Sequence, residues 1–190
     1  MLVGELTNQH DYLTTSPLLV ASPARIIFAY LYPMSPNEQL IQKFYAAFQQ
    51  LDYKTMQDCY SDDAVFSDPA FGTLNSKEVK AMWEMLCKQA KDFSLSFSNI
   101  QSLDEEYCTC NWIATYNFSK TGRKVVNNIT AHIRIQDGKI TEHTDNFDLW
   151  KWSKQALGLT GLLFGWTPMI QNKIRSTARK NLEKFIEKSH

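Results

Sequence analysis

The chain has 190 residues, of which 44% are hydrophobic, 13% aromatic and 21% charged. This length and composition predict one globular domain with a substantial core, and they argue against collagen-like, low-complexity and wholly disordered chains. Lys+Arg and Asp+Glu both number 20, so nucleic acid is not an expected partner. A membrane is not expected either, because no apolar run reaches the roughly 18 residues needed to span a bilayer.

The first helix has a clear start, and the sequence before it does not resemble a folded segment. Residues 1–33 lack periodicity and the basic start of a secretory signal. Ser35, Pro36 and Glu38 then form a capping box with proline at the first helical position. We therefore expect residues 1–33 to be a poorly ordered extension and residues 34–190 to form a single domain.

Apolar spacing predicts helices first and strands afterwards. Helical periodicity covers residues 36–50, 53–60 and 77–90, with a turn at 61–63 and a short strand at 64–69. Period-two alternation then predicts a meander of four strands at residues 95–99, 108–118, 125–135 and 139–150. Asp137-Gly138 is a strong hairpin signal between the last two. This order predicts an α+β fold, with three helices packed on a curved antiparallel sheet.

The tail, residues 151–190, carries eight basic and two acidic residues and predicts two more helices, at 153–164 and from 168 onward. A dense apolar set precedes the second helix: Leu157, Leu159, Leu162, Leu163, Phe164 and Trp166. The second helix has its own apolar stripe, so we expect the two apolar faces to bury each other as a lid over the domain. The alternative is a short amphipathic membrane anchor, because the last helix is basic.

The four cysteines do not form a disulfide framework. They are Cys59, Cys87, Cys108 and Cys110, with no Cys-x-x-Cys spacing. Reduced, partly buried thiols in a cytoplasmic protein are the expectation.

Several segments resemble the nuclear transport factor 2-like superfamily. IQKFYAAFQQLDYKTMQDCYSDDAVFSDP (41–69), GRKVV (122–126) and HIRIQDGKI (132–140) resemble ketosteroid isomerases. DPAFGTL, MWEML and EHTDNFDLW look more like the SnoaL-like and limonene epoxide hydrolase-like branches. The resemblance covers about residues 36–150 and implies a cone-shaped curved sheet, followed by the helical tail at 151–190. It implies little about activity, because the fold hosts isomerases, cyclases, hydrolases and plain binding proteins.

Three residues are the candidate catalytic groups. The resemblance places Asp68 where ketosteroid isomerases have their catalytic base, and flanking Phe66 and Phe71 would raise its pKa by desolvation. The alternative is that Asp68 only ends the strand and caps the Asp-Pro turn. His143 and Asp145 alternate on the last strand, on the face that the resemblance turns inward. Asp145 would orient His143 or act as a second carboxylate; alternatively, the two form a satisfied polar cluster.

The sequence departs from its relatives at the oxyanion hole. The tyrosine position on the first helix is Phe44, with Tyr45 one residue away, and the aspartate position on the sheet is Ala131. We therefore do not expect ketosteroid isomerase chemistry. Arg134 alternates with isoleucines and should face outward, so epoxide hydrolase chemistry is not expected either.

An apolar pocket for a small hydrophobic ligand follows from the resemblance and the aromatic content. Its expected lining is Phe44, Tyr45, Phe48, Trp83, Trp112, Asn127 and Phe147, although simple core packing is the stronger interpretation for Trp112. No metal ligands have sensible spacing, and no cofactor is expected. Two functions remain open: a cofactor-free acid/base isomerase, cyclase or hydrolase, and a non-catalytic ligand-binding or interaction module.

The resemblance also implies pairing of two copies through the open face of the sheet. In this chain that face would carry Asn128, Thr130, His132 and Arg134, a polar mixture suited to a wet interface. We therefore expect a homodimer.

Overall fold

The computed structural model describes residues 33–188, so the expected extension lies, except for Pro33, outside the described residues. The helices are α2 (Pro36–Gln49), α3 (Tyr53–Asp58), α4 (Ser76–Gln89), α5 (Leu149–Leu157), α6 (Leu159–Phe164) and α7 (Pro168–Lys188). The strands are β1 (Tyr60–Asp68), β2 (Gly72–Asn75), β3 (Ser94–Ser102), β4 (Tyr107–Phe118), β5 (Arg123–Gln136) and β6 (Lys139–Asn146). The expected α+β architecture is confirmed.

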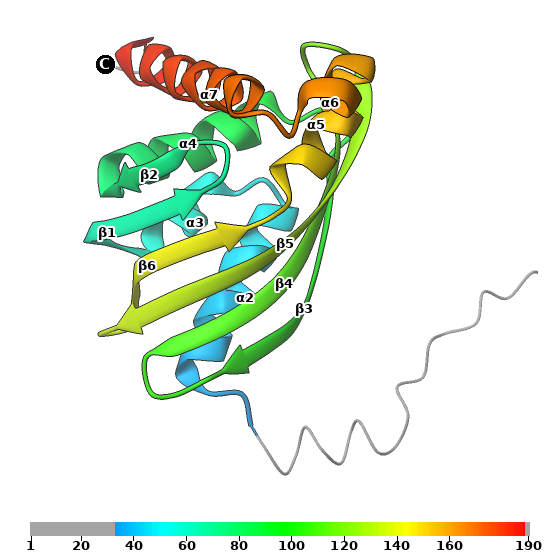
Figure 1. The fold of residues 1–190 in the computed structure, drawn as a ribbon. Coiled ribbons are helices and arrows are strands. Elements are labelled where there is room, and N and C mark those ends of the chain that lie inside the picture. Colours follow the sequence, from blue (N-terminus) through cyan, green and yellow to red (C-terminus); the bar gives the residue numbers. More distant parts are fainter. Residues whose placement is uncertain (1–32, 189–190) are drawn as a thin grey trace, which may run out of the picture. The chain divides into compact units, whose positions relative to one another are not determined.

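The strands form one curved sheet in the order β2-β1-β6-β5-β4-β3 (Figure 1). The four-strand meander is present as β3 to β6, but β1 joins it by pairing parallel to β6. The turn expected at Ser61–Asp63 is wrong, because these polar residues lie within β1. These three polar residues lack the alternation of buried and exposed side chains that indicates a strand. The register of β1 also shifts between Tyr60 and Val65. The short strand β2 was not expected.

The local signals for helix starts and the hairpin are confirmed. Ser35 accepts a hydrogen bond from the Glu38 backbone N–H at 3.2 Å, and the Glu38 carboxylate accepts one from the Ser35 N–H at 2.8 Å. Asn75 and Glu78 form the same capping box at α4. Asp137 and Gly138 have φ of 51° and 71°, the left-handed pair that a two-residue hairpin turn requires.

Helices α2, α3 and α4 pack on the inner face of the sheet, and the core lies between them. Residues alternate strictly along β5, so that Ile129, Ala131 and Ile133 are buried while Thr130 and His132 face outward. All four cysteines are free and buried.

The tail differs from the expected lid. The first tail helix is divided by Gly158, whose φ of 62° ends α5, so three tail helices are present among the described residues. Helix α7 packs on α4 through its apolar stripe, and Leu182 is only 2% exposed. In α6, however, Leu159, Leu162 and Leu163 are exposed. The expectation that both apolar faces bury each other is therefore wrong, because α6 packs on α5 with its glycine face.

Helix α5 completes the sheet where β6 stops. The last partner of β5 in β6 is Asn146, opposite Thr130, which leaves the beginning of β5 unpaired on that side. The Gln155 carboxamide fills the gap by accepting from the Val126 N–H at 2.9 Å and donating to its carbonyl at 3.0 Å. No helix in residues 33–188 is long and apolar enough to cross a bilayer.

Candidate active site

Parallel pairing of β1 and β6 brings the two candidate carboxylates together. Phe66 pairs with His143 and Ser67 with Thr144, so Asp68 is the next residue beside Asp145. Phe66 and His143 are buried, which puts Asp68 and Asp145 on the same inner face by the period-two alternation of strands. On the other side of β6, Asp145 pairs with Ala131.

Asp145 lies at one end of a buried hydrogen-bonded chain. Its Oδ1 accepts from the Trp112 indole N–H at 3.1 Å and lies 3.2 Å from His143 Nε2. The side chain of His143 is fully buried and that of Asp145 is 4% exposed. Within residues 33–188 no hydrogen bond reaches Oδ2 of Asp145, so the second oxygen keeps its accepting capacity.

The other end of the chain is Tyr60. Its hydroxyl lies 2.6 Å from His143 Nδ1 and accepts from the Trp83 indole N–H at 3.0 Å. An indole nitrogen can only donate, so the Tyr60 proton is free to point at Nδ1. The arrangement that satisfies every group is therefore a neutral His143 that accepts at Nδ1 and donates from Nε2 to Asp145.

Asp68 is half-buried at the end of β1, and its Oδ1 accepts from the backbone N–H groups of Ala70 at 2.9 Å and Phe71 at 2.5 Å. Burial raises the pKa of Asp68 from 3.8 to about 7, and the charge of Asp145 adds to the increase, while these backbone hydrogen bonds oppose it. The Asp68 carboxyl group thus caps the Asp-Pro turn, which was the non-catalytic role considered for it, and its pKa also lies near neutral pH.

Helix α7 contacts the turn that follows Asp68. Arg175 Nε donates to the carbonyl of Pro69 at 3.0 Å, and Arg179 Nη1 donates to that of Thr73 at 2.7 Å. The basic tail thus holds the turn that supports one of the two carboxylates.

Tyr45 is the unusual group in this interior. Its side chain is fully buried, yet its hydroxyl has no hydrogen-bond partner among the described residues. Its ring stacks on Phe97 with centroids 5.7 Å apart and contacts Trp112 at 5.8 Å. Burial, followed by the charge of Asp145, raises the pKa of Tyr45 well above its ordinary value. Although Tyr45 lies one residue after the expected tyrosine position, its hydroxyl is therefore still in the buried interior, between α2 and the sheet.

The other expected lining residues separate into two groups. Phe44, Phe48 and Trp83 are buried in one aromatic cluster, in which Phe44 lies edge-on to His143 at 5.7 Å. Asn127 and Phe147 are half-buried, on β5 and directly after β6. The buried group therefore supports the polar chain, and only the half-buried pair offers accessible surface.

Tyr60, Tyr116 and Trp152 take part in this polar interior although none of them was predicted as a site residue. Trp152 on α5 donates to the Tyr116 hydroxyl at 2.8 Å. Burial and the charge of Asp68 raise the pKa of Tyr116, and the hydrogen bond from the Trp152 indole opposes the increase. Period-two alternation predicted that Tyr116 shares a face with Trp112, but it did not indicate a role in the site. No sequence signal indicated Tyr60, because its strand was interpreted as a helix end and a turn.

Arg134 faces outward, as expected, and pairs with Glu106 at 2.8 Å and Glu142 at 2.9 Å. No cluster of three potential metal ligands occurs within the part of the chain that the structure describes. A hollow of about 390 Å³ lies over β3, β4 and β5 and is lined by Ser96, Phe97, Ser98, Asn111, Trp112, Ile113, Asn128, Ile129 and Thr130. Two of its members, Asn128 and Thr130, belong to the surface expected to pair two copies, and Asp68, His143 and Asp145 do not line the hollow.

Both the sequence and the structure of this chain are similar to those of known proteins with SnoaL-like or ketosteroid isomerase-like domains. Residues 41–143 match the sequence model of the SnoaL-like domain, and no curated protein matches the chain. A protein from Catenulispora acidiphila with a ketosteroid isomerase-like fold, crystallised with trimethylamine, superimposes with a TM-score of 0.56 at 14% identity, covering 68% of this chain and 97% of that one. TerC, co-crystallised with polyporic acid, gives 0.57 at 17% identity over 65% and 100%. A limonene epoxide hydrolase-like epoxide hydrolase of M. tuberculosis gives 0.54 at 19% over 68% and 96%.

Proposed function

This chain belongs to the SnoaL-like domain family, and we propose that it is a cofactor-free acid/base enzyme acting on a small hydrophobic ligand. The observation that carries the proposal is the position of Asp68 and Asp145, each directly after the last paired residues of β1 and β6 (Ser67 and Thr144), in an aromatic interior. Two neighbouring carboxylates with different surroundings have different pKa values, so one of them can transfer protons while the other supplies a fixed charge.

Asp68 is the proposed proton-transfer group. Its pKa of about 7 leaves it partly ionised at neutral pH, where a carboxylate with a raised pKa is a stronger base than an ordinary one. It is half-buried, so a ligand reaches it more readily than it reaches Asp145. Phe71 and Phe147 are half-buried aromatic residues of the same region and would contact the apolar part of the ligand.

Asp145 and His143 have the positioning role. The negative charge of Asp145 raises the pKa of Asp68, and the hydrogen bonds from Trp112 and His143 hold Asp145 Oδ1 in place. His143 is itself fixed by Tyr60, so the carboxylate has a defined orientation. The hydrogen-bonded chain from Tyr60 to Asp145 therefore holds the Asp145 carboxylate next to Asp68.

Tyr45 is the proposed donor to the ligand. A buried hydroxyl without a partner is costly, and a ligand oxygen would satisfy it. The Tyr45 ring contacts Trp112, the Trp112 indole donates to Asp145, and Asp145 and Asp68 each follow the last paired residues of β6 and β1, so the base and the donor lie in the same region. A base and an oxygen-directed donor suit proton transfer beside a carbonyl or enol, the chemistry of isomerases and cyclases. No arginine joins the two carboxylates among the described residues, which disfavours epoxide hydrolysis.

Deuterium exchange tests the proposal without knowledge of the natural substrate. Cyclic ketones such as 2-tetralone are incubated with the protein in D₂O, and exchange beside the carbonyl is followed by NMR. We expect exchange that rises with pH and levels off above about 7, and an Asp68→Asn variant at least ~100-fold slower.

Asp148→Asn is the matched control, because Asp148 is an exposed N-cap of α5 and asparagine also caps helices. Equal exchange by wild type and Asp68→Asn would contradict the proposal. Ligand binding without exchange by the wild type would instead support the alternative, a non-catalytic binding module.

A further inference from the structure

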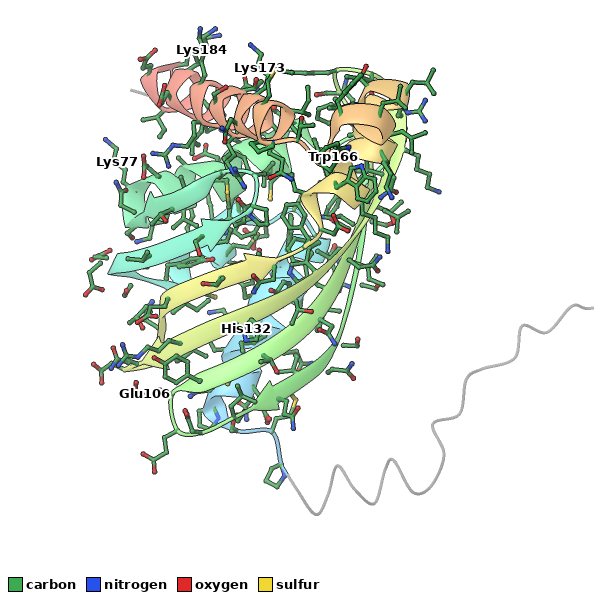
Figure 2. The ribbon with its side chains drawn as sticks, in the orientation of Figure 1. Lys77, Glu106, His132, Trp166, Lys173 and Lys184 are labelled. Atoms are coloured by element: carbon green, nitrogen blue, oxygen red, sulfur yellow. The ribbon has the colours of Figure 1, made fainter. Side chains whose placement is uncertain are left out.

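A patch of apolar side chains is exposed on α6, on the connection to α7 and at the start of α7. We call it the α6 patch; its members are Leu159, Leu162, Leu163, Phe164, Trp166 and Met169. Trp166 is 61% exposed and lies where α6 meets α7 (Figure 2). Contiguous apolar surface of this kind marks a site of interaction in a water-soluble domain.

The glycines of α6 explain why these side chains point outward. A Cβ atom on Gly161 would lie 1.9 Å from the carbonyl oxygen of Ser153, and one on Gly165 would lie 1.9 Å from the Ser153 Oγ. Both glycines are buried, so α6 packs on α5 through its bare face. Every large apolar side chain of α6 is consequently left on the outer side, held by close backbone packing.

The patch continues into a row of lysines. At 100° per residue, Lys173, Lys180 and Lys184 lie within about 60° of Met169 around α7, opposite the buried Leu182. All three lysines are exposed, and none forms an ion pair within residues 33–188. Figure 2 shows Lys173 and Lys184 projecting away from the rest of the domain.

The remaining charges of α7 do not cancel this row near the patch. Arg175 and Arg179 are directed to the backbone of Pro69 and Thr73. The acidic residues Glu183 and Glu187 lie on the same face as the lysine row, but they occur only in the last two turns of the helix, away from the α6 patch. The part of α7 that adjoins the α6 patch is therefore purely basic.

We propose that the α6 patch and the lysine row dock this protein on the surface of an anionic membrane. Leucine, phenylalanine and tryptophan side chains enter the interface between headgroups and acyl chains, while lysines attract anionic lipid headgroups. The short helix α6 would lie in the interface without crossing it, because its six residues are too few to span a bilayer. None of the members of this surface is a residue of the proposed active site.

Vesicle co-sedimentation of the full chain tests the proposal. We expect binding to vesicles of equal parts phosphatidylcholine and phosphatidylserine, and weak binding to phosphatidylcholine alone. Leu163→Glu should weaken the anionic-vesicle binding by roughly tenfold to a hundredfold, because it removes an inserted leucine. Leu103→Glu is the matched control, since Leu103 is 59% exposed and Leu163 58%.

Charge reversal tests the lysine row separately. The double variant Lys173→Glu, Lys180→Glu should lose the preference for anionic vesicles, and added salt should weaken wild-type binding. Binding that is indifferent to salt, headgroup charge and both lysines would overturn the proposal. So would equal vesicle binding by Leu163→Glu and Leu103→Glu.

The competing occupant is a second copy of the chain. If the wild type ignores vesicles and Leu163→Glu, but not Leu103→Glu, converts an oligomer to a monomer in sedimentation, the patch is a protein interface and the membrane proposal is wrong.

Discussion

Replacing Tyr60 with phenylalanine removes a hydroxyl that links two buried nitrogen groups. The Trp83 indole N–H and His143 Nδ1 both lose their partner, and both lie in the buried interior. Each lost hydrogen bond contributes about 1 kcal/mol, and each buried group left unsatisfied adds to that cost. We expect Tyr60→Phe to reduce the free energy of unfolding by about 2–4 kcal/mol, measured by urea denaturation.

Tyr45→Phe is a control with the same chemistry and the same depth. Tyr45 is 0% exposed and Tyr60 is 2% exposed, but the Tyr45 hydroxyl has no partner among the described residues. Its removal leaves nothing unsatisfied, so the unfolding free energy should stay within about 0.5 kcal/mol of wild type or rise. Equal destabilisation by the two substitutions would refute the hydrogen-bonded chain from Trp83 to Asp145.

Three further predictions concern charge, assembly and packing. Since the pKa of Asp68 is raised from 3.8 to about 7, the folded state holds a proton that the unfolded state releases between these pH values. The free energy of unfolding of the wild type should therefore fall by up to about 4 kcal/mol as the pH rises through this range, and that of Asp68→Asn should lack this decline. The wild type should sediment as a homodimer and Thr130→Arg, on the outer face of β5, as a monomer, whereas a monomeric wild type would rule this interface out. Gly161→Ala should destabilise the protein by about 2 kcal/mol or more, because the new Cβ meets the Ser153 backbone; a gain in stability, as in an unobstructed helix, would contradict that packing.

The sequence predicted the elements that depend on local signals. The capping box at Ser35 and the Asp137-Gly138 turn depend on neighbouring residues, and both are present. Alternation along β4 and β5 likewise predicted which face is buried. Alternation along β6 likewise placed His143 and Asp145 on one face, where they are in contact.

The missed features depend on long-range pairing. The parallel pairing that sets Asp68 beside Asp145 joins residues 77 positions apart, and no local pattern specifies it. Tyr60 was missed because polar residues in β1 resemble a turn. The outward orientation of α6 depends on which of its faces is small enough to approach α5, a question of close packing that hydrophobicity alone does not answer.

The central claim is that Asp68 and Asp145 are neighbouring, interacting carboxylates. Carbon-13 NMR can follow the Asp68 carboxyl group through a pH titration, in the wild type and in Asp145→Asn, whose amide oxygen still accepts from Trp112. We predict a pKa near 7 for Asp68 in the wild type and a lower pKa in the variant, because the neighbouring charge is gone. A wild-type pKa near 3.8 that is unchanged by Asp145→Asn would contradict the account.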